Sequence, residues 1–419
     1  MRICFYNPHA VGNVLGITIL PFIFESRQRL KHFRRFDFLL NLLRDERYDA
    51  AIVVDGTSSS LPFGSFGPII NNSFLIRIVS FLEIYIWCLL NKINPLKRKI
   101  IFSLDKIDPK NDILFGFAYI TGTFHDDKMI EASFFKKFKG KKILHATHFY
   151  AETGKVAKNI EKTGTKFMLA EANLKKSDYF NKYLGFIKLV GIIPFVLRKK
   201  YISKKVFVLR KNKCIALGTL EIFPKNYKLS EDHFKFFGTD TLHPMRKIIA
   251  ENFSKYPQTL DSLISTYQNK SYNEKKNFIQ RRTIYKLIKK LMLIFRPIGK
   301  NYHNFDIVEK FNEYKMFVAP EEDIGLPSIN FIEGMACGCA YIGMDSFMYE
   351  DLGLKKGVHY IAYNGTISDL DEKIRYYQGH QEELEKIARA GHEFVIKNFQ
   401  ENKIINTFLE VTNNLASSD

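Results

Sequence analysis

The chain has 419 residues, 46% hydrophobic and 26% charged, so it is long enough for two domains and too apolar for a disordered protein. Its five cysteines lack the density and paired spacing of a disulfide or zinc framework, which excludes a small cysteine-stapled domain and predicts no metal site. A formal net charge of +19 requires an anionic partner or surface.

Short apolar runs alternate with longer helical patterns through the first half of the chain. The runs predict strands at 3–6, 50–54, 99–102, 113–117, 143–147 and 167–170. The longer patterns predict helices at 27–44 and 74–91, the second containing Arg77 and Glu83, which favour a helix of the domain over a membrane span. This alternation predicts a parallel sheet with helices on both faces.

A second series of strands begins near residue 213. It predicts strands at 214–218, 314–319, 340–342 and 360–362, with helices between them. The stretch Ile192 to Val196, followed by the basic Arg198 to Lys205, is interpreted as the crossing between two α/β domains. The predicted division is residues 1–205, residues 206–395 with a basic helical insertion at about 255–300, and a C-terminal helix at 396–419.

The segment 270–300 concentrates about half of the excess positive charge. It contains ten Lys or Arg and a single acid, Glu274, and its apolar residues recur at helical spacing. Such a basic amphipathic helix can dock on an anionic membrane surface. An ordinary helix whose apolar stripe faces the core is the alternative, and nucleic-acid binding is not expected because no recognition motif accompanies the charge.

The segment 314–343 carries the most specific pattern. A buried strand ends at Pro320, an acidic loop follows, Ser328 can cap a helix running to about Cys337, and Gly338 can close it. In a parallel sheet, ligands bind beyond the carboxyl ends of the strands, where helix starts attract anions. The loop from Gly325 to Ser328 is therefore predicted to receive a diphosphate.

The carboxylates beside this loop suit a different part of a ligand. Because carboxylates accept hydrogen bonds from paired hydroxyls, they are predicted to bind sugar hydroxyls. Glu333, in the second turn of the helix, could reach a ribose, and Glu321 or Glu322 could reach a transferred sugar. In the N-terminal domain, His125-Asp126-Asp127 is interpreted as the first turn of a helix instead of a metal site.

The string Gly325-Leu326-Pro327, followed by Glu333-Gly334-Met335-Ala336-Cys337-Gly338, resembles the donor-site signature of retaining glycosyltransferases of family four. The resemblance implies the GT-B architecture: two Rossmann-like, doubly wound parallel-sheet domains facing each other across a cleft. It also makes Glu333 the ribose-binding glutamate. The first glutamate of the family's Glu-x7-Glu motif is displaced, because Gly325 stands eight residues before Glu333 and the acids lie ten to twelve residues before it.

The same resemblance suggests further donor ligands. Thr219 stands where the family commonly has a phosphate-binding arginine, and Lys225 occupies the region of the family's lysine, so Lys225 and Arg246 are the predicted phosphate ligands. In the N-terminal domain, His148 is predicted beside the donor sugar and Gly12 in a loop that approaches donor or acceptor. A solvated surface lysine and a structural histidine are the alternatives for Lys225 and His148.

These features predict a glycosyltransferase that moves a hexosyl unit from a nucleotide sugar, such as a UDP- or GDP-hexose, without metal or other cofactor. Retention of the anomeric configuration follows only from the resemblance. In an inverting reaction, the first candidates for the general base would be Asp126, Asp127 or His148. A glycan or lipid-linked acceptor of bacterial surface polysaccharide, such as lipopolysaccharide, and a peripheral position at the cytoplasmic face of the membrane are expected. A catalytically degenerate GT-B protein that binds a membrane partner is the alternative.

Overall fold

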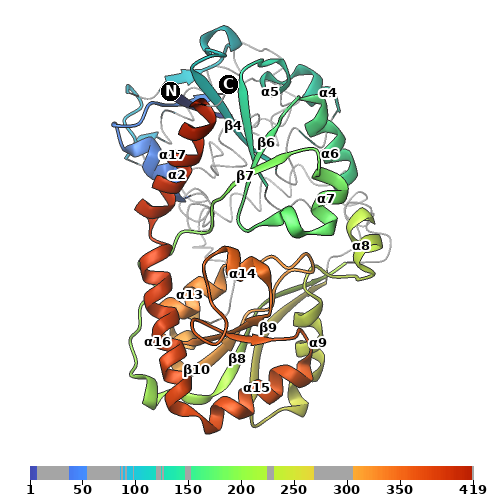
Figure 1. The fold of residues 1–419 in the computed structure, drawn as a ribbon, viewed down its shortest axis with the longest axis vertical. Coiled ribbons are helices and arrows are strands. Elements are labelled where there is room, and N and C mark those ends of the chain that lie inside the picture. Colours follow the sequence, from blue (N-terminus) through green and yellow to red (C-terminus); the bar gives the residue numbers. More distant parts are fainter. Residues whose placement is uncertain are drawn as a thin grey trace, which may run out of the picture.

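The computed structural model describes two α/β domains (Figure 1). The chain crosses from the first domain to the second after Ile192 and returns to the first between Asn398 and Glu401. The described residues are 1–6, 37–53, 85, 88–89, 92–97, 99–118, 124, 127–146, 152–223, 231–268 and 305–417. Most of the predicted helix at 74–91, the basic segment 270–300, His148, Lys225 and Gly12 lie outside these residues. Among the described helices, none combines the length and apolarity needed to span a membrane.

The N-terminal domain is built on a parallel sheet in which β4 is the central described strand. Its described strands lie in the order β3-β2-β1-β4-β5-β6-β7. They are β1 (Arg2–Tyr6), β2 (Ala50–Val53), β3 (Lys99–Ile101), β4 (Asp112–Ala118), β5 (Lys141–Ala146), β6 (Phe167–Ala170) and β7 (Lys188–Ile192). The register places Cys4 beside Ala51 on one side and Leu114 on the other.

The C-terminal domain has a second parallel sheet, whose described strands lie in the order β12-β11-β10-β8-β9. They are β8 (Lys211–Ile222), β9 (Leu260–Gln268), β10 (Tyr314–Val318), β11 (Ala340–Met344) and β12 (Ile361–Tyr363). The strand β10 lies between β8 and β11, so its carboxyl end is flanked by the ends of both neighbours.

Apolar side chains alternate between the two faces of each sheet. In β1, Ile3 and Phe5 join one core cluster while Cys4 and Tyr6 join another. In the second sheet, Phe317 lies in one cluster and the adjoining Val318 in the other. Both faces of both sheets are therefore buried, which is why these strands read as continuous apolar runs.

Helices cover both sheets. In the N-terminal domain they are α2 (Asp37–Arg44), α4 (Asp127–Ala132), α5 (Phe134–Lys137), α6 (Thr153–Lys162) and α7 (Asp178–Leu184). In the second half they are α8 (Glu231–Phe237), α9 (Pro244–Asn252), α12 (Ile307–Glu313), α13 (Asn330–Ala336), α14 (Phe347–Asp351), α15 (Ile367–Gly379), α16 (Gln381–Asn398) and α17 (Glu401–Ser417). Short 3-10 turns occupy Leu104–Lys106, Leu174–Lys176, Phe207–Leu209 and Phe253–Lys255.

The chain returns to the N-terminal domain at its C-terminal end. Helix α16 packs on α13 in the second domain, and α17 runs along the first domain beside α2 (Figure 1). The N–H of Leu197 donates to the carbonyl of Phe399 where the two crossings meet. Phe408 of α17 is fully buried against Phe115 of β4, with ring centroids 5.2 Å apart, so α17 completes the first domain's core.

The predicted fold class, two parallel-sheet α/β domains, is confirmed, but two strands were missed. Strand β7 ends where the segment interpreted as a crossing begins, and β9 lies inside the predicted insertion. The prediction of an insertion from about residue 255 is therefore wrong at its start, because Leu260–Gln268 pairs with β8 along its whole length. The chain passes from the first sheet to the second between Ile192 and Lys211.

Candidate functional site

The loop after β10 forms a tight turn at the carboxyl edge of the second sheet. The N–H of Gly325 donates to the carbonyl of Glu322 at 2.8 Å, and the N–H of Glu322 donates to the carbonyl of Leu326 at 3.1 Å. Gly325 has φ of 80°, in the left-handed region that glycine occupies without strain. We call residues 320–328 the donor loop, after the ligand that the sequence predicts for it.

Helix α13 follows the donor loop and starts one residue later than predicted. Ser328 still serves the helix start, since its Oγ accepts from the N–H of Asn330 at 3.4 Å and its carbonyl from the N–H of Phe331 at 3.0 Å. The predicted stop at Gly338 is confirmed, because Gly338 has φ of 73° and donates to the carbonyl of Met335 at 2.8 Å.

Helix α13 packs face-on against β10. A Cβ added to Gly334 would lie 2.3 Å from the Phe317 ring, so only glycine allows this contact. All seven helix residues are buried, and Glu333 is 1% exposed. Glu333 therefore lies at the predicted place, one turn into the helix, beneath the molecular surface.

Glu321 is also buried, at 3% exposed. Its Oε1 accepts hydrogen bonds from the hydroxyls of Tyr349 and Tyr341 and, at 2.9 Å, from the N–H of Met344. Burial raises the pKa of Glu321, although these hydrogen bonds oppose that change. The carboxyl thus joins β10 to the end of β11, and the predicted role of Glu321 toward the transferred sugar stays a prediction.

Arg246, on α9, makes the corresponding link on the other side of β10. Its guanidinium donates to the carbonyl of Thr219 at 2.9 Å and to that of Pro320 at 2.9 and 3.2 Å. The side chain is 6% exposed and lies on Gly218, the position next to the missing family arginine. It therefore brings a positive charge to the predicted place, although these three hydrogen bonds of its guanidinium go to backbone carbonyls.

The donor loop faces the N-terminal domain. Ile324 and Leu326 pack against a core cluster of that domain, into which Met348 of α14 also inserts. Close by, the Asn173 amide donates to Asp351 at 2.9 Å across the two domains. The loop therefore lies at the junction of the domains, the place where a ligand shared by both must bind.

A buried hydrogen bond between His233 and Asp323, which the sequence did not predict, holds the middle of the loop. Nε2 of His233 lies 2.8 and 2.7 Å from the two carboxylate oxygens of Asp323. Burial raises the pKa of Asp323, while the hydrogen bond and charge of His233 oppose that change. Asp323 is one of the three acids that lie ten to twelve residues before Glu333, and no sequence motif marks His233.

The remaining predicted residues have mixed outcomes. Glu322 is partly exposed in the turn, so of the two predicted acids only Glu322 has surface to offer a sugar. His148, Lys225 and Gly12 lie outside the described residues, and their roles stay predictions. Within the described part of the chain, no group of three or more His, Cys, Asp or Glu is placed to hold a metal ion.

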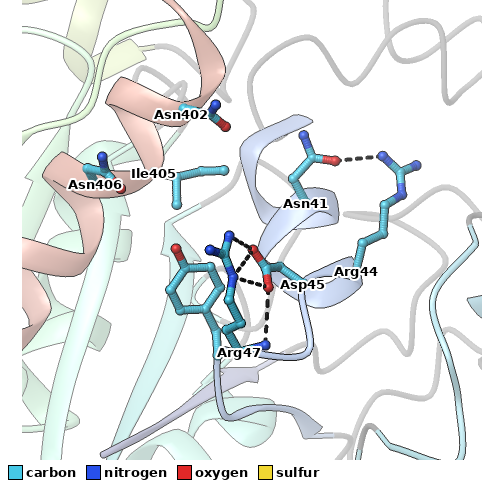
Figure 2. Close-up of a pocket in the computed structure, with 8 residues that line it drawn as sticks. Asn41, Arg44, Asp45, Arg47, Asn402, Ile405 and Asn406 are labelled. Carbon is cyan, nitrogen blue, oxygen red and sulfur yellow. Dashed lines mark hydrogen bonds and ion pairs between the residues drawn. The ribbon is translucent and has the colours of Figure 1, made fainter.

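A cavity of about 500 Å³ lies away from the donor loop, between α2 and α17. Figure 2 shows its polar lining, in which Arg47 pairs with Asp45 and Arg44 donates to the Asn41 side chain at 2.7 Å. Ile405 and two asparagines of α17 form the opposite wall. Because its lining comes from α2, the turn that follows α2, and α17, this cavity shares no residue with the donor loop.

Comparisons with known proteins agree with this geometry. Residues 281–410, which include the donor loop and α13, match a family model described as glycosyl transferase-like. A stretch of 103 residues, 24% of this chain, is 31% identical to protein O-glucosyltransferase 2 of Danio rerio and spans 19% of that protein.

Solved structures with a similar fold cover the whole chain. Sucrose-phosphate synthase from Thermosynechococcus elongatus aligns with 100% of both chains at a TM-score of 0.50 and 11% identity. HepE from Anabaena, in complex with UDP and glucose, aligns with 99% of this chain and 100% of its own at a TM-score of 0.49 and 11% identity. The chain has the GT-B fold, with a glycosyl transferase-like C-terminal part.

Proposed function

We propose that this GT-B chain is a glycosyltransferase that transfers a hexosyl unit from a nucleotide sugar, held by the C-terminal domain, to a glycan or lipid-linked acceptor. One observation carries the proposal: the donor loop and α13, within the segment that matches the glycosyl transferase-like model, lie at the carboxyl edge of the sheet and face the other domain. Nucleotide ligands bind at this edge of parallel sheets.

The donor is assigned to three parts of this edge. The turn at Gly325 and the start of α13 receive the diphosphate, Glu333 receives the ribose, and Glu322 is the remaining acid for the transferred sugar. Because Glu333 is buried beside a junction where the domains touch, donor entry requires the domains to separate. Closure around the donor would then exclude water from the reacting sugar.

Thermal stabilisation by a panel of nucleotide sugars tests the proposal. A donor at one hundred times its dissociation constant stabilises the folded state by about 2.7 kcal/mol, so UDP-, GDP- or ADP-hexoses should raise Tm in a saturable way. The parent nucleoside diphosphate should stabilise too, and free hexose should not. If no nucleotide sugar of the panel changes Tm, the chain is not a transferase of this kind.

We also propose that transfer is retaining and independent of metal, and that the acceptor lies at the cytoplasmic face of a membrane. The first two follow from the donor-site signature, and the third from the basic segment 270–300, which offers apolar insertion together with attraction to anionic head groups. The anomeric configuration of the product and full turnover in the presence of EDTA test the first two.

A degenerate GT-B scaffold is the second candidate. Thr219 in place of the family arginine, the displaced acids and the buried carboxyl of Glu321 favour it. Release of nucleoside diphosphate from the stabilising donor separates the two candidates, because a scaffold that retains the fold would bind without turnover.

A further inference from the structure

Helix α8 belongs to the second half of the chain but packs on the N-terminal domain. The Asp232 carboxylate accepts a hydrogen bond, at 3.1 Å, from the N–H of Gly154 in the first turn of α6. The rings of Phe236 and Phe237 pack on Tyr179 of α7, with centroids 5.2 and 5.3 Å away. Figure 1 shows α8 at the level between the two lobes.

His233 of α8 touches both domains at once. Its ring packs edge to face on Tyr179, with centroids 4.9 Å apart, while its Nε2 bonds Asp323 of the donor loop. The side chains of His233 and Asp323 are 1% and 4% exposed. One imidazole therefore connects the surface of the N-terminal domain to the centre of the donor loop.

Asp323 is the point at which the donor loop is anchored. Its own N–H donates to the carbonyl of Leu242 at 2.8 Å, and the turn from Glu322 to Leu326 closes around it. A buried carboxylate that loses its partner must take up a proton or move toward water, because an unpaired charge is costly inside a protein. In either case, loss of His233 removes the hydrogen bond that ties Asp323 to α8 and so loosens the turn that carries Gly325.

We propose that His233 is a positioning residue that fixes the donor loop through Asp323 when α8 rests on Tyr179, so that donor affinity depends on the contact between the domains. This inference rests on the proposed function of the donor loop. It assigns no chemical step to His233. It predicts that a change in Tyr179, which is on the other domain, weakens donor binding as a change in His233 does.

Four variants and two measurements test this inference. His233→Ala removes the hydrogen bond, and His233→Gln restores a donor at the place of Nε2. Tyr179→Leu removes the ring from the opposite domain, and Lys235→Ala is the matched control on the exposed face of α8, where Lys235 pairs with Glu231. Hydrogen exchange of the donor loop without ligand and calorimetric affinity for UDP and GDP are measured for each.

His233→Ala should speed exchange in the donor loop by about tenfold or more and weaken nucleotide binding by a similar factor, with β11 exchange unchanged as the internal reference. His233→Gln should recover most of both effects, Tyr179→Leu should resemble His233→Ala, and Lys235→Ala should match the wild type. If His233→Ala proves unstable, His233→Gln and Tyr179→Leu still give the comparison.

The two ways of failing are distinct. Donor-loop exchange that stays at the wild-type rate in His233→Ala and Tyr179→Leu, with nucleotide binding intact, overturns this inference alone. Equal effects of His233→Ala and His233→Gln also overturn it, because the hydrogen bond would then be irrelevant. A wild-type chain that binds neither UDP nor GDP, and whose Tm no nucleotide sugar of the panel changes, overturns the proposed function together with the donor role of His233.

Discussion

The guanidinium of Arg246 lies so close to Gly218 that a Cβ on this glycine would stand 2.7 Å from Nε of the arginine. Gly218 also has φ of 145°, which side chains rarely adopt. The arginine can therefore reach the carbonyls of Thr219 and Pro320 only because residue 218 has no side chain. This contact links Thr219 of β8 to Pro320, just after β10, at the carboxyl edge of the second sheet.

Removing either member of this contact should destabilise the C-terminal domain. Arg246→Ala leaves two carbonyls without their charged donor, at a cost of about 2 kcal/mol or more. Gly218→Ala should cost a similar amount by pushing the guanidinium away. Chemical denaturation measures both, and the double variant should lose less than the sum, because each change removes the same interaction. Full additivity would contradict this explanation.

Gly334→Ala should destabilise the protein although alanine favours helices. The new methyl group would overlap the Phe317 ring, and overpacking of this kind costs about 1–3 kcal/mol. Adding Phe317→Leu should recover part of the loss by making room. Gly379→Ala, where an added Cβ meets no atom within 4 Å, is the control and should be neutral or slightly stabilising. Equal Tm values for the two alanine variants would show that α13 packs differently.

The sequence was most informative where local chemistry decides the structure. Apolar runs located β1 and β10, and glycine marked the turn at Gly325 and the helix end at Gly338. Strand β9 was missed because it is an edge strand whose polar residues, such as Asp261, Ser262 and Ser265, interrupt the apolar run that marks a fully buried strand.

The direction of a charged side chain could not be predicted from the sequence. The direction of the Glu321 carboxyl depends on its hydrogen bond with Tyr349, 28 residues away. The position of Arg246 depends on Pro320, 74 residues away. His233 meets Asp323 at a separation of 90 residues. The motif at 325–338 therefore located the donor loop and α13, but it could not distinguish the residues that support this part of the fold from those that face a ligand.

Glu321→Gln should change how stability depends on pH. Because burial raises the pKa of Glu321 in the folded state, the folded chain binds this proton more tightly than the unfolded chain. The contribution of Glu321 to the free energy of unfolding is thus fully present below the unfolded pKa of about 4.3 and is lost as pH rises through the folded pKa. Glutamine has no such proton, and its oxygen can still accept from Tyr349 and the N–H of Met344.

The difference in Tm, Glu321→Gln minus wild type, should therefore increase from about pH 4 to about pH 7. The phenol groups of Tyr341 and Tyr349 stay neutral throughout, since burial raises the pKa of each. Glu372→Gln, an exposed position on α15, is the control and should give a flat difference. A flat difference for Glu321→Gln would show that this carboxyl titrates as it does in water.

Charge reversal in the basic segment should weaken membrane binding. Lys286, Lys289 and Lys290 each contribute about 1 kcal/mol near an anionic surface, so their joint replacement by Glu should release the protein from phosphatidylserine vesicles at physiological salt. Replacing Lys386 and Lys397, exposed on α16, is the control. Unchanged co-sedimentation of the first variant would remove the membrane from the proposed function.

Glu333→Gln is the most direct probe of the donor position. A charge-assisted hydrogen bond to a ribose hydroxyl contributes about 1.5–3 kcal/mol, so its weakening should lower kcat/KM by roughly tenfold to a hundredfold, mainly through KM for the nucleotide sugar. The nearly isosteric amide should keep α13 folded, which far-UV circular dichroism and Tm check. Glu393→Gln, on the exposed face of α16, should leave kinetics unchanged. If Glu333→Gln keeps the fold and the wild-type KM, the ribose binds elsewhere at the carboxyl edge of the second sheet.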